Sequence, residues 1–367
     1  MQTIMFEDIA SAIAQQNYTT ATQLIHTLKQ EHPDHPWLTF YGAQVEAAQG
    51  NLETAKATYQ NLLQECSNRK LLLQIREALR QLETIESESE QSAIAQALAQ
   101  PGGKDTAVFI LSALPSEEKQ QAAQLLAKTF SIDPYNARLQ IPSRGWRLFR
   151  IGEKGELSYY SEALQKKNIP CFCAPLNALD SLNVIQVQYF RTEGNQVTAR
   201  CINDKGQEGT LVFQWSDIQQ QVQGRVPIFE EITTKDKRGK VVRKTETLDY
   251  VQFCDLHLFQ KQTILRLCDQ KYQFQQSAPL TDNIQKGETI TRNWLQLLNY
   301  LEEQMPNLQR WGDFTPFGES AIAFPQMLKR ITPYIDLKRR YETSWDAAFQ
   351  LYSGLLFFKG ESDLKQP

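Results

Sequence analysis

Two short spacings of cysteine and histidine contain the residues of this sequence that could hold a metal ion. Cys171 and Cys173 are separated by one residue, and Cys254 and His257 by two. Residues two apart on a strand share a face, and cysteine and histidine ligands suit tetrahedral zinc. Cys254 and His257, three apart, would lie on opposite faces of a continuous strand. We therefore expect these cysteines to pack in the core. The alternative is a metal- or thiol-dependent enzyme using Cys171, Cys173 and His257.

Other polar groups gather in two loops without a catalytic pattern. His32, Asp34 and His35 lie within four residues and are flanked by prolines, which is typical of an ordinary loop. Asp313 and Glu319 flank an aromatic segment and could act as paired carboxylates, although a loop packed by its own aromatic rings explains them more simply. The sequence contains no glycine-rich phosphate-binding motif and no arrangement typical of an activated nucleophile. We predict no catalytic residue, no metal and no cofactor.

The densest run of positive charge lies between residues 235 and 244, where six basic residues accompany one acidic residue. This run, with Gly239 in its middle, is typical of the tip of a long hairpin. Three alternatives stay open: a solvated hairpin, an arm that contacts a protein, and an arm that follows the phosphate backbone of RNA. The basic residues are Lys235, Lys237, Arg238, Lys240, Arg243 and Lys244.

A 34-residue repeat organises the N-terminal part of the chain. Seven pairs of residues recur at this distance, and most of them are apolar. Within each repeat the apolar residues follow one another every three or four positions, which predicts amphipathic helices. The pairs are Phe6 with Phe40, Ile9 with Ala43, Ile13 with Ala47, Tyr18 with Leu52, Ala21 with Ala55, Ile25 with Tyr59, and Leu28 with Leu62.

Residues 2–66 resemble two tetratricopeptide repeats (TPRs), each a unit of two helices in which a small residue allows close packing. Ala21 and Ala55 occupy that small position. Pro33 falls where such a repeat commonly ends, and residues 70–82 match a closing helix that covers the last exposed face.

The resemblance implies a concave surface, formed by the first helix of each pair, that binds a peptide segment of another protein. The candidate contacts are Asn17, Glu46 and Gln49. A structural role, in which the helices only dock on the rest of the chain, stays open. The whole chain is also similar in style to glutamine-rich, TPR-containing proteins of cyanobacteria, which implies a role in assembling photosynthetic complexes.

Beyond the repeats, changes of pattern divide the 367-residue chain. The acidic run at 86–90 and Pro101-Gly102-Gly103 predict a linker. After the linker, the sequence predicts strands and helices in the order β-α-β-α-β. Apolar residues then alternate with a period of two, as in strands, and the last part returns to helical spacing. We predict a multidomain α+β protein. Its parts are TPR-like helices at 1–83, a linker at 84–104, a small α/β domain at 105–176, an antiparallel β-sheet or barrel at 177–284, and C-terminal helices at 285–367 packed on the sheet.

Charge and composition narrow the class of protein. The net charge is −3, and residues 1–90 hold 12 acidic and 6 basic side chains, so a nucleic-acid contact would need a local patch. No apolar run approaches the ~18 residues of a membrane helix, and Glu7 and Asp8 make a signal peptide unexpected. Six cysteines over this length predict reduced thiols in a cytoplasm rather than a disulfide framework.

These observations together predict a non-enzymatic cytoplasmic adaptor, scaffold or assembly factor. It would bind a protein partner through residues 1–83 and would not insert into a membrane. The second hypothesis is an RNA- or ribosome-associated protein that uses the hairpin at 235–244, and the third is the metal- or thiol-dependent enzyme.

Overall fold

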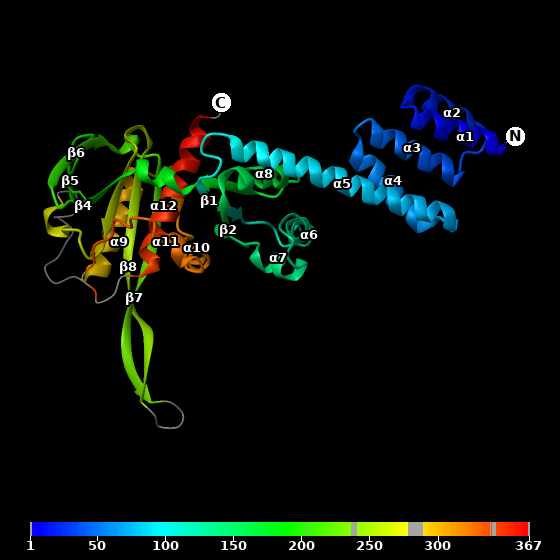
Figure 1. Ribbon diagram of the computed structural model, residues 1–367. Helices are drawn as coiled ribbons and strands as arrows, with labels where there is room; N and C mark the ends of the chain where they lie inside the picture. Colours follow the sequence, from blue (N-terminus) through cyan, green and yellow to red (C-terminus); the bar gives the residue numbers. More distant parts are fainter. Residues whose placement is uncertain are drawn as a thin grey trace. The chain divides into compact units, whose positions relative to one another are not determined.

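The computed structural model describes residues 2–203, 205–235, 241–277, 289–337, 339 and 343–365 (Figure 1). The chain forms two compact units, Met1–Gln96 and Ala97–Pro367. The first unit is helical, and the second combines helices with two β-sheets. The predicted fold class, a mixture of N-terminal helices and later β-sheets, is confirmed in this general form.

The first unit contains two helix pairs and most of a long fifth helix. α1 and α3 begin at Gln2 and Pro36, and α2 and α4 begin at Tyr18 and Leu52, so the second pair repeats the first at an offset of 34 residues. The helices are α1 (Gln2–Ala14), α2 (Tyr18–Glu31), α3 (Pro36–Ala48), α4 (Leu52–Glu65) and α5 (Arg69–Ala99).

Small residues and turns explain how these helices pack. Ala21 on α2 and Ala55 on α4 are fully buried, because a methyl side chain lets the neighbouring helix approach closely. The side chain of Asn17 accepts a hydrogen bond from the Thr20 backbone N–H and so caps α2. Gly50 ends α3 with a φ of +90°, which glycine adopts without steric cost.

The predicted linker at 84–104 is wrong for residues 84–99, which continue α5 as far as Ala99. Alanine, glutamine and glutamate all favour the helical conformation, and this preference outweighs the repulsion between the glutamates of the acidic run. An ion pair between Lys56 of α4 and Glu86 also fixes this part of α5. The helix ends only before Pro101-Gly102-Gly103, where Gly102 has a φ of +74°. The boundary between the two units therefore falls inside a helix.

The second unit begins with a three-stranded antiparallel sheet in the order β2-β1-β3. The middle strand is apolar from Ala107 to Leu111, and both of its faces are buried there. Phe109 and its neighbours on one face pack against α6, α7 and α8, whereas Val108 and Ile110 on the other face join the core of the larger sheet. The elements are β1 (Thr106–Ser112), β2 (Trp146–Glu153), β3 (Cys171–Pro175), α6 (Lys119–Phe130), α7 (Pro134–Gln140) and α8 (Lys154–Gln165).

This shared core is why the second unit is not divided as the sequence predicts. The segments 105–176, 177–284 and 285–367 all contribute to one hydrophobic cluster. The Leu148 backbone N–H of β2 also donates a hydrogen bond to Ser320 Oγ, at 3.0 Å. Residues 97–367 therefore form one compact unit around that cluster.

The larger sheet has seven strands in the order β10-β7-β8-β9-β4-β5-β6. It is mixed, and the prediction of an antiparallel sheet is wrong for two strand pairs: β4 runs parallel to β9, and β10 parallel to β7. β9, which pairs with β8 on one side, lies on its other side against β4, the first strand of the preceding meander, and runs parallel to it. The strands are β4 (Asn183–Glu193), β5 (Gln196–Ile202), β6 (Glu208–Gln214), β7 (Gln220–Lys235), β8 (Val241–Leu258), β9 (Thr263–Cys268) and β10 (Gln309–Trp311).

Helices cover both faces of the larger sheet. α9 packs on one face with Cys254, Leu256 and Leu258 of β8, and α10, α11 and α12 pack on the other face with Phe253. This alternation follows from the period of two along a strand. The helices are α9 (Ile290–Gln304), α10 (Phe314–Ala321), α11 (Pro325–Leu328) and α12 (Ser344–Lys365).

Asp269, directly after β9, places a carboxylate where its charged form is unfavourable. It is buried, and its Oδ1 atom has no hydrogen-bond partner. Burial raises the pKa of Asp269 to about 6, and the nearby Asp249 adds to the rise, although backbone hydrogen bonds oppose it. Since the folded pKa exceeds that of the unfolded chain, the stabilisation from protonated Asp269 is complete below about pH 4 and is lost as the pH rises through about 6.

We therefore expect Asp269→Asn to raise the free energy of unfolding at pH 7.5 by about 1–3 kcal/mol, because the amide removes the cost of burying a charge. The gain should shrink at pH 4, where the native side chain is protonated. Urea unfolding of the full chain at both pH values measures this. Asp336→Asn, which removes a charge from an exposed ion pair with Lys271, is the control and should change little. An Asp269→Asn gain equal at both pH values, or a loss at pH 7.5, would contradict the burial argument.

Candidate functional site

A groove between α3 and α5 in the first unit is the strongest candidate for binding. Its cavity has a volume of about 260 Å³. Most of its lining residues are uncharged, either glutamines or apolar residues. One lysine and one glutamate add opposite charges. The lining residues are Phe40, Gln44, Lys70, Leu73, Gln74, Glu77, Ala78 and Gln81.

Leu73 makes this groove unusual, since its side chain is 65% exposed although it lies in a concave surface. Burying an isobutyl group of this kind contributes about 1.5–3 kcal/mol. Beside it, the amides of Gln44 and Gln74 each carry one acceptor and two donor hydrogens, which match the backbone groups of a peptide. The amide of Gln81 already donates one hydrogen bond to Glu77. The groove therefore offers an apolar contact together with hydrogen bonds to the peptide backbone, which do not depend on the side chains of the peptide.

The charges of the groove nearly cancel. Hydrogen bonds from Arg80 and Gln81 lower the pKa of Glu77, so this carboxylate is ionised at neutral pH. Lys70 supplies one positive charge to the same lining. The groove thus favours a segment of low net charge over a strongly acidic or basic one.

Two of the three polar residues that the sequence suggested for this surface make local hydrogen bonds at helix ends. Asn17 caps α2, and the Glu46 carboxylate accepts a hydrogen bond from Asn51 Nδ2 at 2.7 Å. Gln49 follows the last residue of α3 as its C-cap, at the start of the turn. None of the three lines the groove cavity. They lie near the ends of helices, whereas the groove is lined by residues inside α3 and α5, on a helix face that the pairing of helices defines.

The predicted basic hairpin is the end of a long ribbon formed by β7 and β8, which extends beyond the rest of the sheet (Figure 1). Arg243 and Lys244 are exposed and pair across the ribbon with Thr233 and Ile232. Lys235 ends β7. Lys237, Arg238 and Lys240 lie outside the described residues.

Within its described residues the ribbon carries both signs of charge. Arg243 and Lys244, as neighbours on a strand, point to opposite faces. Glu230 lies directly opposite Glu246, a pairing of like charges that favours neither a basic face nor a phosphate contact at that level. The described part of the ribbon therefore gives no specific support to RNA binding.

The three residues proposed for a metal site are not brought together. Cys171 and Cys173 do share a face of β3, as expected, and pack with α8 in the core of the small sheet. Burial raises the pKa of Cys171 to about 11 and also raises that of Cys173, which keeps both as thiols. His257 lies in the other sheet, on β8. Among the described residues, no group of three or more histidine, cysteine or acidic side chains could hold a metal ion.

All six cysteines are described by the structure, and all are free. The predicted separation of Cys254 and His257 is confirmed, since Cys254 packs on the α9 face and His257 faces α12. The other suggested groups also have structural surroundings. Asp313 forms an ion pair with Arg144 at 3.5 Å, and the His35 ring stacks on Phe6 at 4.8 Å.

His257 belongs to a buried polar network that no local sequence pattern indicates. Ser353 of α12 donates a hydrogen bond to Asp255 Oδ2 at 2.6 Å, and His257 Nε2 donates to Ser353 Oγ at 3.0 Å. Gln220 Nε2 donates to His257 Nδ1 at 2.8 Å and to the Leu356 carbonyl at 2.8 Å. Each polar group of the imidazole is thus satisfied.

The order of these groups differs from that of a hydrolytic triad. In a triad the histidine lies between the aspartate and the serine, so that it can take the serine proton. Here Ser353 lies between Asp255 and His257, and all three side chains are fully buried. Burial lowers the pKa of His257 to about 3, so the ring is neutral at physiological pH. The arrangement joins α12 to the sheet and has no access for a substrate.

Comparison with known proteins finds no matching family model, no matching curated protein and no matching solved structure. In the part of the chain that the structure describes, none of the helices combines the length and the apolar character needed to cross a bilayer.

Ser353→Ala should lower the free energy of unfolding by about 1–3 kcal/mol, because the imidazole N–H and one carboxylate oxygen lose a buried partner. Ser362→Ala on the same helix is the matched control. Its hydroxyl is exposed and bonds only locally, to the Phe358 carbonyl, so a change within about 0.5 kcal/mol is expected. Urea unfolding of the full chain measures both. Equal effects of the two variants would show that the buried hydroxyl does not join α12 to the sheet.

Proposed function

We propose that the protein is a non-enzymatic adaptor or assembly factor that binds a segment of a partner protein in the groove between α3 and α5. The observation that carries this proposal is Leu73, an apolar side chain left exposed in a concave, amide-lined surface. Covering this leucine with another apolar group would be favourable, because it removes apolar surface from water. The repeated helix pairs and their resemblance to TPRs support the same function.

The chemistry of the groove describes the segment that fits it. A cavity of about 260 Å³ accepts one or two apolar side chains against Leu73 and Phe40. The neighbouring glutamine amides then bond the peptide backbone on either side. Because Lys70 and Glu77 offset each other, we expect a segment with an apolar anchor and little net charge. Binding of this kind requires no catalytic residue and no cofactor.

The basic ribbon is a weaker candidate for the binding of nucleic acid. Its described residues mix acidic and basic side chains, with Glu230 facing Glu246. We therefore place the main contact in the first unit.

A photo-reactive amino acid placed at position 73 of the full chain tests the groove. We expect it to crosslink a defined peptide segment of a partner in cell extract, whereas the same group at Ile85 should not. Ile85 is a matched control because it lies on the same helix, is 48% exposed and does not line the cavity.

The segment identified in this way is then synthesised, and its affinity for the full chain is measured by fluorescence anisotropy. We expect Leu73→Asp to weaken binding by about tenfold or more, because burying a carboxylate against an apolar group is unfavourable. Ile85→Asp should leave the affinity unchanged. Circular dichroism of both variants checks that the helices are retained. Crosslinks of equal yield at both positions, or equal affinities of the two variants, would rule out the groove as the binding site.

A further inference from the structure

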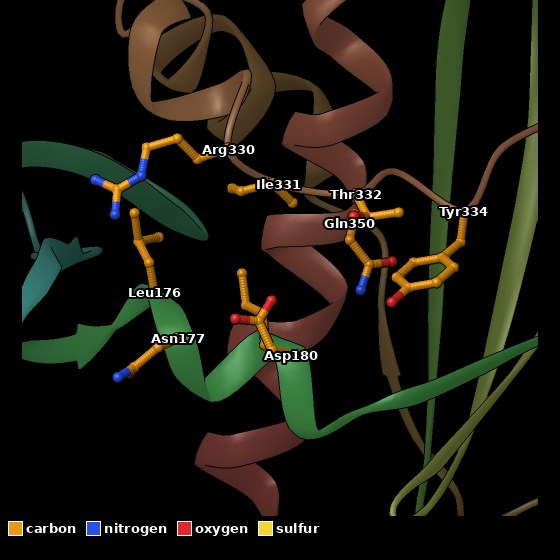
Figure 2. Close-up of a pocket in the computed structure, with 9 residues that line it drawn as sticks. Leu176, Asn177, Asp180, Arg330, Ile331, Thr332, Tyr334 and Gln350 are labelled. Carbon is orange, nitrogen blue, oxygen red and sulfur yellow. The ribbon is translucent and has the colours of Figure 1, made fainter.

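We propose that the second unit carries a binding site for a small α-amino acid, a function beyond the peptide groove of the first unit. The site is a pocket formed by η1 (Leu176–Ser181), by residues 330–334 after α11, and by Gln350 of α12 (Figure 2). Its volume is about 80 Å³. At ~10–15 Å³ for each water-sized group, this space holds about five to eight non-hydrogen atoms.

Gln350 supplies the first observation that points to a ligand. Its side chain is only 1% exposed, and its Oε1 accepts a hydrogen bond from Arg266 Nη2 at 2.9 Å, which fixes the orientation of the amide. The Nε2 group on the other side is buried and has no hydrogen-bond partner. Figure 2 shows this amide between Asp180 and Tyr334. Leaving a buried donor without an acceptor costs free energy. The pocket therefore has a donor in its floor that requires an acceptor.

The charges at the rim supply the second observation. Asp180 of η1 and Arg330 are both exposed and line the same pocket, yet the described residues include no ion pair between them. Arg330 Nη1 instead donates to Thr106 Oγ1 at 3.0 Å, which holds the guanidinium at one end of the pocket. The rim thus presents a negative and a positive group at separate positions above a floor that contains buried Leu179 and Ile331.

The backbone of the pocket is held in an unusual conformation. Tyr334 has a φ of +51°, in the left-handed region that residues other than glycine rarely adopt. Arg266 Nη1 donates to the carbonyl of the preceding Pro333 at 2.7 Å and fixes the loop there. The same arginine therefore positions both the loop and the Gln350 amide. Strained backbone held by buried groups is typical of sites that bind ligands.

A small zwitterion matches these groups best. Its carboxylate accepts from Gln350 Nε2, its ammonium group bonds Asp180, and its carbon atoms contact the apolar floor. A simple carboxylate would leave Asp180 without a cationic partner, and a simple amine would leave Gln350 Nε2 without an acceptor. Glycine, alanine and serine have the required groups and fall within the size limit.

Isothermal titration calorimetry of the full chain tests this site with glycine, alanine, serine, acetate and ethylamine. We expect saturable binding of at least one of the three amino acids below about 10 mM, and none by acetate or ethylamine at that concentration. The absence of binding by all three amino acids would overturn the proposal. Acetate or ethylamine that binds as tightly as the best amino acid would also overturn it.

Two variants locate the site. Asp180→Asn removes a charge at the exposed rim, and Gln350→Glu keeps an acceptor for Arg266 but replaces the unpaired donor by an oxygen. Each should weaken amino-acid binding by about tenfold or more, as expected for a charge-assisted hydrogen bond. Lys329→Gln is the control, because Lys329 is exposed next to Arg330 but does not line the pocket. If the Gln350→Glu variant does not fold, the Asp180→Asn variant alone tests the site. Unchanged affinity in that variant would refute the site.

Discussion

The ion pair between Arg266 of β9 and Asp255 of β8 is the interaction on which the second unit depends. Both side chains are buried, with exposed fractions of 1% and 0%, and they meet through two hydrogen bonds of 2.9 and 2.7 Å. Burying two charges is costly, and only good geometry with further hydrogen bonds offsets this cost. Arg266 obtains them from the Pro333 carbonyl and from Gln350 Oε1, and its guanidinium also lies 5.0 Å from the centre of the Phe349 ring.

This pair links elements that are distant in sequence. Through Ser353 and Gln350 it holds α12 against the sheet, and through Pro333 it holds the loop that carries Tyr334. Gly354 allows the close approach of α12 to η1, since a β-carbon there would lie 2.2 Å from Leu179 Cδ2. The polar groups thus specify one position of the helix, and the small residue makes that position sterically possible. The pocket between η1 and α12 is a consequence of this placement.

The sequence predicted the elements whose signal is local. The 34-residue spacing predicted the helix pairs, and the alternating residues of β8 correctly separated Cys254 from His257. It failed where the deciding contact is distant. Residues 84–99 form helix because their composition favours it and Glu86 meets Lys56, although an acidic run suggested a linker. No local pattern shows that Asp255, Arg266 and Gln350 meet, or that Leu73 faces a groove, since each depends on how elements pack.

We propose that the first unit recognises a protein segment through α3 and α5. Hydrogen–deuterium exchange of the full chain, with and without a saturating concentration of the crosslinked segment, tests it most directly. We expect slower exchange in α3 and in the first half of α5, with exchange in the β7–β8 ribbon unchanged. Protection confined to the ribbon, with α3 and α5 unaffected, would contradict it.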